Sequence, residues 1–500
     1  SVVLLCSGFA LYSFFRLSAA EGQKDFNLYE LVPSTTSAVF VTDDVLEFVA
    51  EVDDLTCSKN QQYLYVSKLF SYLKQSLYAL SEDTPHGLSR QMNQMLISFH
   101  EPDNERNQVL YCRLGNGDKE LVNRFVRKYI SSLYPPKTFI YKGEEIIIYP
   151  MADGDFLACY LTSDFMALSF QKKLIENVID AYKSGKSLAD DSTFTGIRAP
   201  KKSAAAATIY TRMQGMMGWT EFDMKMKDDF IYFSGITHDA DTCFAFINQL
   251  RQQQSVKGFP GEVLPSTAFY FSRQGITDWV SLLSYGNAQG QSVPARTSEV
   301  QNRDKEFSRY LMENAGQDLV ACLFQREDTL QGAAAVLSLS VADVTEAKRM
   351  LRALVNAASA DEGRRNPRIT FCYTVNKAYP IYRLPQTTLF EQLTSFAEPT
   401  LDVYAAFYGG RLLLAPDADA LAHYIRQLDK GEVLNGAMAY QTGMDHLSDS
   451  YHFMLMADFD HIFQQSENHV RFVPDFFLRN ADFFRHFTLF VQFACADGMV

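Results

Sequence analysis

The sequence contains two similar halves, and this internal repeat constrains the fold more than any other feature. The segment LVPSTTSAVFV at residues 31–41 resembles VLPSTAFYFS at residues 263–272. Further along, FLACYLTSDFMALSF at 156–170 resembles DVYAAFYGGRLLLAP at 402–416 in pattern. A unit of roughly 230 residues that occurs twice has to be recognised before single motifs are interpreted, because most of its patterns then belong to the scaffold.

The helix faces and helix ends of the two halves also agree. Two sets of apolar residues correspond: Ile175, Val178, Ile179 and Tyr182 in the first half, and Leu421, Tyr424, Ile425 and Leu428 in the second. Gly185 and Gly431 follow these helices, where glycine readily adopts the left-handed conformation that ends a helix. Asp118 and Asp343 stand at the start of another helix pair, where aspartate is a good N-cap. The shared pattern therefore predicts a shared fold.

The predicted order of elements in each half is β-α-β-β-α-β with additional hairpins. This order predicts an α+β fold in which antiparallel sheets are covered on one face by helices. We expect two tandem copies of this unit, at residues 28–255 and 260–500, the second truncated at its C-terminus. An apolar helix at residues 1–17 and a stalk at 18–27 are expected to precede them.

The first fifteen residues, SVVLLCSGFALYSFF, are uncharged and apolar. A bilayer span needs about 20 apolar residues, so residues 1–17 are predicted to be a membrane anchor completed by a few residues upstream. A signal-peptide core and a buried helix are alternatives, and Ala19-Ala20-Glu21 resembles a cleavage site. The polar residues 21–27 suit a stalk that holds the folded part in the periplasm.

The charge balance argues against a nucleic-acid partner. Lysine and arginine number 46 against 59 aspartates and glutamates, which gives a net charge of −13. Binding to phosphates needs a positive field. The pair Lys201-Lys202 is too small to provide one, and we expect no nucleic acid among the partners.

The eight cysteines are far apart in the sequence: Cys6, Cys57, Cys112, Cys159, Cys243, Cys322, Cys372 and Cys495. No pair has the spacing of a metal knuckle or a redox motif. Those at 112, 159, 322, 372 and 495 lie in apolar strand-like runs, and we expect them to be buried free thiols. A disulfide is the alternative, and the sequence does not select its partners.

Ser169 and Lys172 fit the S-x-x-K motif of penicillin-binding enzymes, and Lys183-Ser184-Gly185 resembles their K-T-G element. The second element should lie on a distant strand, whereas here it follows on the same helix. The second half has Ala415 and Ala418 at the equivalent positions. We therefore interpret Ser169 as a helix N-cap and predict no catalytic residue.

Five histidines lie late in the chain: His446, His452, His461, His469 and His486. Aspartates lie among them, but a metal site needs three or four ligands that converge in space. The spacings of 6, 9, 8 and 17 residues fit no standard pair of ligands. We predict no metal and no cofactor.

Two aspartate pairs are candidates for carboxylate chemistry. Asp190-Asp191 lies in a predicted loop and is expected to be solvated. Asp417 and Asp419 precede a predicted helix, where acidic residues interact favourably with the N-terminal dipole. Gly115-Asn116-Gly117 lacks the remainder of a glycine-rich phosphate loop.

Eight phenylalanines fall between residues 472 and 493: Phe472, Phe476, Phe477, Phe483, Phe484, Phe487, Phe490 and Phe493. A helical turn followed by a buried strand explains them. The alternative is the wall of an apolar groove that binds a lipid or a hydrophobic peptide. Trp219, beside Met213, Met216 and Met217, is a candidate for a similar surface in the first half, because methionine adapts to varied apolar partners.

The chain resembles a domain-of-unknown-function family of uncharacterised, membrane-anchored periplasmic proteins from Bacteroidales-type Gram-negative bacteria. The segments that carry the resemblance are the apolar start, VPSTTSAVFV at 32–41, FIYKGEEIIIYP at 139–150 and FMALSFQKKLIENVIDAYKSGKSL at 165–188. The resemblance covers most of the chain and implies one N-terminal membrane segment with a large extracytoplasmic part. It brings no catalytic residues.

These observations predict a non-enzymatic cell-envelope protein anchored in the inner membrane. It would act by binding protein partners or an apolar ligand, with its folded part in the periplasm. The alternative is an envelope hydrolase with an unrecognised active site. An enzyme should show a pocket with converging titratable groups, whereas a binding protein should show an exposed apolar patch.

Overall fold

The structure, a computed structural model, divides into two compact units, Ser1–His238 and Asp239–Val500, and each is described by itself. It describes residues 26–55, 94–100, 106–115, 118–125, 134–151, 154–198, 205–212, 219–227, 230–237, 245–283, 297–326, 332–375, 377–394, 402–464, 473, 478 and 481–495. The predicted anchor at 1–17 and nearly all of the predicted stalk lie outside these residues. Within them, no helix has both the length and the apolar character that a membrane crossing requires.

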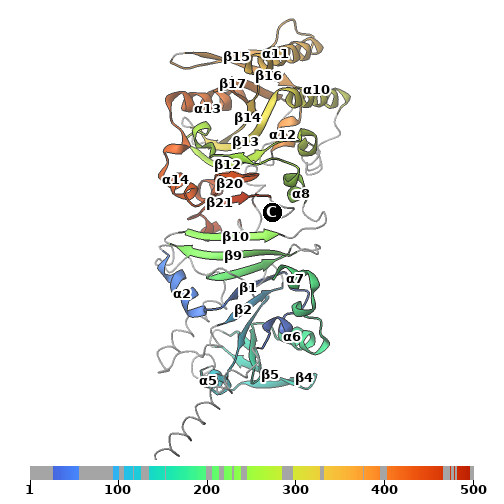
Figure 1. Ribbon diagram of the computed structural model, residues 1–500, viewed down its shortest axis with the longest axis vertical. Coiled ribbons are helices and arrows are strands. Elements are labelled where there is room, and N and C mark those ends of the chain that lie inside the picture. The colour runs from blue at the N-terminus through green and yellow to red at the C-terminus, as the bar shows by residue number, and fades with distance from the viewer. Residues whose placement is uncertain are drawn as a thin grey trace, which may run out of the picture. The chain divides into compact units, whose positions relative to one another are not determined.

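The first unit is built on one antiparallel sheet of ten strands in the order β10-β9-β8-β1-β2-β3-β7-β6-β5-β4 (Figure 1). The strands are β1 (Ala38–Thr42), β2 (Met95–Phe99), β3 (Gln108–Arg113), β4 (Lys137–Tyr141), β5 (Glu144–Pro150), β6 (Phe156–Leu161), β7 (Phe165–Ser169), β8 (Ala207–Thr211), β9 (Thr220–Lys227) and β10 (Phe230–Thr237). The central strands are almost entirely buried, as in β7, where all five residues are inaccessible.

Helices pack on both faces of this sheet. The helices α2 (Val45–Asp54) and α5 (Asp118–Phe125) bury Phe48 and Val122 in the core on one face. The helices α6 (Lys172–Ser184) and α7 (Ser192–Ile197), with the short turns η1 (Leu28–Leu31) and η3 (Leu188–Asp190), form the other core around Ile175 and Phe194. The expectation of helices on one face only is therefore wrong, because these strands are apolar on both sides and need cover on both.

The second unit has a nine-stranded antiparallel sheet in the order β15-β16-β17-β18-β14-β13-β12-β20-β21. Its strands are β12 (Ala268–Gly275), β13 (Ala315–Gln325), β14 (Ala333–Val341), β15 (Ile369–Tyr373), β16 (Ala378–Pro385), β17 (Asp402–Tyr408), β18 (Arg411–Ala415), β20 (Phe453–Asp458) and β21 (Thr488–Phe493). A separate two-stranded ribbon joins β11 (Val256–Lys257) to β19 (Ser450–Tyr451).

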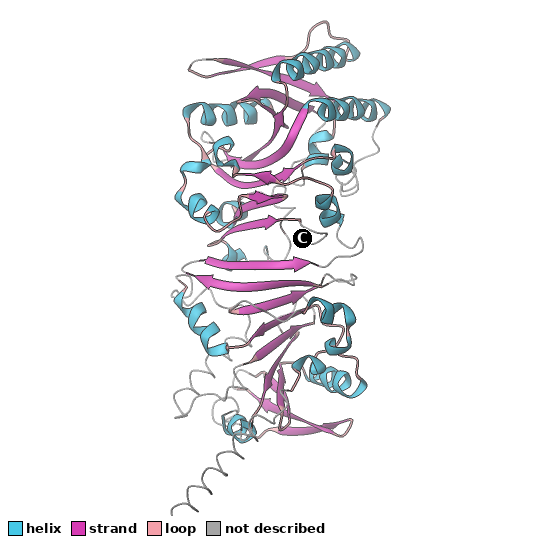
Figure 2. Ribbon diagram, viewed as in Figure 1, coloured by secondary structure: helices cyan, strands magenta, loops and turns pink. Residues whose placement is uncertain are grey.

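Helices cover both faces of the second sheet as well (Figure 2). On one face lie α10 (Ser298–Asn314), α11 (Val344–Asp361), α12 (Leu389–Leu393) and α15 (Phe459–Phe463). On the other lie α13 (Ala418–Lys430) and α14 (Met438–Met444). The remaining elements are α8 (Ala245–Arg251), α18 (Ala481–Phe484) and the turns η4 (Pro260–Val263) and η5 (Leu434–Gly436). The unit begins at Asp239 and so includes α8, which the sequence placed before residue 255 in the first repeat.

Local details recur in the two units. Gly185 and Gly431 end α6 and α13 with φ angles of 64° and 78°, the left-handed conformation predicted for both. Asp343 caps α11 through the backbone N–H groups of Thr345 and Glu346, as predicted. Asp118, by contrast, lies inside the first turn of α5, and its carboxylate accepts from the N–H of Gly115 at 2.7 Å.

The described cysteines are free thiols, as predicted. Cys112, Cys159, Cys322 and Cys372 are buried, whereas Cys495 is partly exposed. Burial raises the pKa of the Cys112 and Cys159 thiols to about 12. Both therefore stay protonated at neutral pH, and the thiolate that reacts with oxidants does not form.

Candidate functional site

Ser169 is not the N-cap of a helix. It ends β7 and is completely buried, while Gln171 occupies the N-cap position of α6. The hydroxyl of Ser169 donates to the carbonyl of Gln108 at 2.7 Å and accepts from the N–H of Gln171 at 3.1 Å. The ammonium of Lys172 pairs with Glu176 at 2.7 Å. Ser169 and Lys172 therefore interact with different partners, and the S-x-x-K match reflects the packing of the fold rather than a catalytic pair.

Ser169→Ala is expected to destabilise the first unit by about 1–2 kcal/mol, because it removes two hydrogen bonds of a buried hydroxyl and leaves the Gln108 carbonyl unpaired. Chemical denaturation followed by circular dichroism measures the change. Covalent labelling of Ser169 by a fluorophosphonate probe would contradict the structural role.

The late histidines that the structure describes form no metal site. His461 Nδ1 lies 2.9 Å from a carboxylate oxygen of Asp458, the residue that caps α15. His452 Nδ1 accepts from the N–H of Cys495 at 3.1 Å. His469 lies outside the described residues. In the part of the chain that the structure describes, no three His, Cys, Asp or Glu side chains are placed to hold a metal ion.

Two predicted surface features of the first unit are part of its packing. Asp190 accepts from the hydroxyl of Ser187 at 2.6 Å, and Asp191 is the N-cap of α7. Asp190 is exposed, as expected, whereas Asp191 is only partly exposed because it caps α7. Trp219 is buried rather than exposed, with the guanidinium of Arg212 lying 4.8 Å from its ring. The methionines expected beside it lie outside the described residues.

The described phenylalanines of the late segment are partly buried, and Phe484, Phe487 and Phe490 pack against the core. Phe484 lies 5.9 Å from Phe459, and Phe493 lies 6.0 Å from Phe453, measured between ring centroids. Phe490 packs against the core on the α13 side of the sheet. Phe472, Phe476 and Phe477 lie outside the described residues, as does the side chain of Phe483. The predicted order of a helical turn and a strand is confirmed for the residues that the structure describes. The prediction that the strand is buried is wrong, because Thr488 is exposed and the rest of β21 (Thr488–Phe493) is only partly buried at the edge of its sheet.

A serine–histidine pair that the sequence analysis missed lies in the first unit. Ser98 Oγ is 2.9 Å from Nε2 of His100 and 3.1 Å from the hydroxyl of Tyr111. Such a pair is the first requirement of nucleophilic catalysis. However, Ser98 is fully buried in the middle of β2, where a substrate cannot reach it. The pair is best explained as a buried polar network.

We expect the stability of the first unit to fall in mild acid because of His100. Burial lowers the pKa of His100 from 6.5 to about 4. Between these values the unfolded chain binds a proton that the folded chain does not, so stability falls as pH drops from 6.5 and levels off below about 4. The loss is about 2 kcal/mol after allowance for partial exposure of the ring. His100→Gln should abolish this pH-dependent loss of stability. Parallel curves of unfolding free energy against pH for the two proteins between pH 7 and 4 would contradict the prediction.

Among the residues of the second unit that the structure describes, a group of exposed apolar side chains lies on the outer hairpin β15–β16. Ile369, Phe371 and Tyr373 are 39%, 49% and 70% exposed, and Val375 beside them is 94% exposed. The side chains of Ile369, Phe371 and Tyr373 share one face of β15, and Val375 follows the strand. Cys372, on the other face, contacts Ala422 of α13. The surface formed by Ile369, Phe371, Tyr373 and Val375 is called the hairpin surface below.

A hollow of about 220 Å³ lies between the hairpin surface and α11. Its lining residues are Arg352, Val355, Asn356, Pro367, Ile369, Phe371, Pro380 and Tyr382. The guanidinium of Arg352 donates to the hydroxyl of Tyr382 at 3.0 Å, which fixes one wall. The hollow can accept an apolar side chain beside Phe371.

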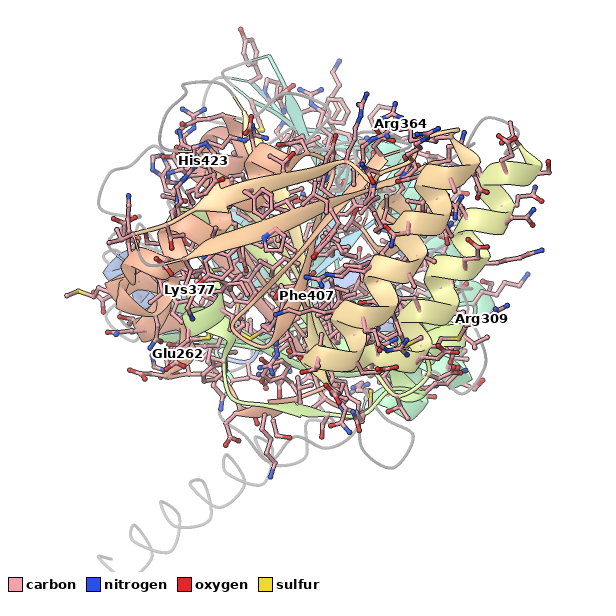
Figure 3. All side chains as sticks on the ribbon, turned by 90° about the horizontal axis from the view of Figure 1, so that it is seen from above. Glu262, Arg309, Arg364, Lys377, Phe407 and His423 are labelled. Atoms are coloured by element: carbon pink, nitrogen blue, oxygen red, sulfur yellow. The ribbon has the colours of Figure 1, made fainter. Side chains whose placement is uncertain are left out.

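Arginines gather around this surface. From 344 to 385 the chain carries eight basic against three acidic residues, in a protein of net charge −13. Figure 3 shows Arg364 and Lys377 towards opposite ends of the hairpin. Arg365 and Arg368 are exposed, and neither has an ion-pair partner within the described residues. Other arginines of this stretch have carboxylate partners: Arg349 pairs with Glu346, Arg364 with Glu362, and Arg383 with Asp402.

The corresponding hairpin of the first unit, β4–β5, is different. It also forms the end of its sheet, and Ile140 on β4 is 70% exposed. However, Pro135 and Pro136 precede β4, and Lys137 begins it. Proline and lysine are residues that protect an open sheet edge from further pairing. The two units therefore differ at this edge.

No protein-family model, curated protein or solved structure matches this chain.

Proposed function

We propose that this protein acts by binding a protein partner at the cell envelope, through the hairpin surface. Exposed aromatic side chains flanked by arginines are the residues that most often dominate protein–protein interfaces. The hollow of about 220 Å³ is smaller than the roughly 300–1,000 Å³ of sites that enclose small ligands. This difference favours a protein partner over an enclosed lipid.

We also infer that the two units are copies of one fold. Support comes from the sheets: β4-β5-β6-β7-β3-β2-β1-β8-β9 and β15-β16-β17-β18-β14-β13-β12-β20-β21 follow the same course along the chain. Isolated bridges at Pro33–Ser187 and Pro265–Val433 recur in the same place. One copy can then diverge for binding while the other keeps a protected edge.

The proposed location is the inner membrane, with residues 1–17 as the anchor and the folded part in the periplasm. The uncharged stretch 1–15 and the polar residues after it support this placement. Protease added to spheroplasts should digest the folded part while a cytoplasmic marker survives. Protection of the folded part would contradict the proposed topology.

The binding proposal is tested by recovering partners from detergent-solubilised membranes with the tagged full chain. Proteins and lipids are both identified by mass spectrometry. We expect Phe371→Asp with Tyr373→Asp to reduce recovery of the specific protein at least tenfold, since a desolvated aromatic anchor is lost. The matched control is Thr138→Asp with Ile140→Asp on β4 of the first unit, which should leave recovery unchanged.

Circular dichroism and thermal unfolding must show that both variants are folded, which is expected because the substituted side chains are largely exposed. Equal recovery of every protein by the unaltered chain and by the β15 variant would refute the hairpin surface as the binding site. The envelope-hydrolase alternative would gain support from labelling of Ser98 or another serine by a fluorophosphonate probe.

A further inference from the structure

The backbone of β15 is open along the outer edge of its sheet. The N–H of Thr374 donates to the carbonyl of Lys377 at 2.9 Å, and the N–H of Arg383 donates to the carbonyl of Arg368 at 3.3 Å. In an antiparallel pair, alternate residues bond to the same neighbour. The peptide groups that point towards β16 therefore belong to residues 368, 370, 372 and 374. Those that point outward belong to residues 369, 371 and 373.

Two observations agree with this register. Phe371 lies opposite Pro380, which has no N–H to donate and so suits a position without a bonded pair. β15 is also the terminal strand of the nine-stranded sheet. The outward peptide groups therefore belong to Ile369, Phe371 and Tyr373, whose side chains form the hairpin surface.

The equivalent edge of the first unit offers one outward donor fewer. Tyr141 and Glu144 flank a turn at Lys142 and Gly143, whose positive φ angles of 48° and 83° are those of a tight two-residue hairpin. Because the peptide groups alternate in direction along β4, that of Pro136 points outward. It has no N–H, so the first unit lacks a donor where Ile369 supplies one.

We propose that β15 receives an extended acidic segment of another protein as an additional antiparallel or parallel strand. This inference rests on the proposed function and names the partner's chemistry. Main-chain hydrogen bonds to the outward groups would provide affinity, and alternate apolar side chains would lie over Phe371 and the hollow. Carboxylates of the segment would meet Arg365 and Arg368.

Charge complementarity selects this occupant over a second copy of the chain. Antiparallel pairing of two β15 strands would bring the Arg368 end of each towards the Lys377 end of the other. Like charges at such a contact oppose association. An acidic segment instead neutralises Arg365 and Arg368, which have no ion-pair partner within the described residues.

The test is to pan a display library of ten-residue random peptides on the full chain in detergent. Selected peptides should be rich in Asp and Glu with apolar residues at alternate positions. They are then synthesised in two forms, each N-methylated at one of the two alternate sets of amides. Strand addition predicts at least a tenfold loss of affinity for one set and little change for the other, because only one edge of the peptide bonds to β15.

Arg365→Glu with Arg368→Glu should weaken binding of the selected peptides at least tenfold. Lys305→Glu with Arg309→Glu on α10 makes the same change in net charge and should leave binding unchanged. Ile369→Pro, which removes one outward N–H, should also weaken binding, while far-ultraviolet circular dichroism confirms that the variant is folded.

Selection of neutral or basic peptides, or of none, would overturn the proposal. So would equal binding of both N-methylated forms, binding to phosphatidylglycerol vesicles but not to peptides, or a dimer that Ile369→Pro dissociates. If partner recovery depends on Phe371 and Tyr373 while N-methylation has no effect, strand addition fails and the proposed function stands. If recovery does not depend on Phe371 and Tyr373, both strand addition and the proposed function fail.

Discussion

Asp318→Ala is expected to lower the free energy of unfolding of the second unit by about 3–5 kcal/mol, because it leaves buried positive charge uncompensated. Asp318 on β13 is 6% exposed. Its carboxylate accepts from Nε of Arg273 at 3.0 Å and from Nη1 of Arg411 at 3.2 Å. Burial alone would raise the pKa of Asp318, but Arg411, Ser340 and Arg273 outweigh burial and lower it.

The change is measured by hydrogen exchange in β13, which follows the second unit separately from the first. Glu346→Ala is the control, because it breaks the exposed ion pair of Glu346 with Arg349, and exposed pairs contribute little. A loss below about 1 kcal/mol for Asp318→Ala would mean that the carbonyls bound by Arg273 and Arg411 suffice to stabilise both guanidinium groups.

Asp304→Ala is expected to cost about 3 kcal/mol, because several buried donors lose their only carboxylate acceptor. Asp304 on α10 accepts from the hydroxyls of Thr387 and Thr388, both at 2.7 Å, and from the N–H of Thr388 at 2.8 Å. Gln392 donates to it at 3.3 Å. The network ties α12 to α10 directly after Gln386, which has a strained φ of 58°.

Asp304→Asn retains one acceptor oxygen and should therefore lose roughly half as much stability as Asp304→Ala. Denaturant titration monitored by near-ultraviolet circular dichroism compares the three proteins. Equal stability of Asp304→Ala and the unaltered chain would show that water replaces the carboxylate without loss. Faster exchange of the α12 amides in the alanine variant is expected as a local consequence.

Much of the fold was predictable because caps and turns are local signals. Gly185 and Gly431 end their helices as predicted. Ser169 was misassigned because the start of a helix is ambiguous by one or two residues in a sequence. The buried serine hydroxyl still bonds to the N–H at that helix start.

The less predictable parts depend on contacts that are distant in sequence. Helix α10 was missed because its sequence SEVQNRDKEFSRYLMEN is polar, and its buried face includes Arg303 and Asp304, which only a partner such as Thr388 can satisfy. The order of strands decides that β15 is an edge, and no local pattern reveals that order. Arg365 and Arg368 become a binding candidate only beside that edge.

The buried thiols also determine what the chain needs in order to mature. None of the described cysteines is in a disulfide, and burial keeps Cys112, Cys159 and Cys322 protonated. For the part of the chain that the structure describes, folding therefore requires neither an oxidant nor a disulfide isomerase. A cysteine introduced on the surface could be labelled selectively with these three left in place, because only an accessible thiolate reacts.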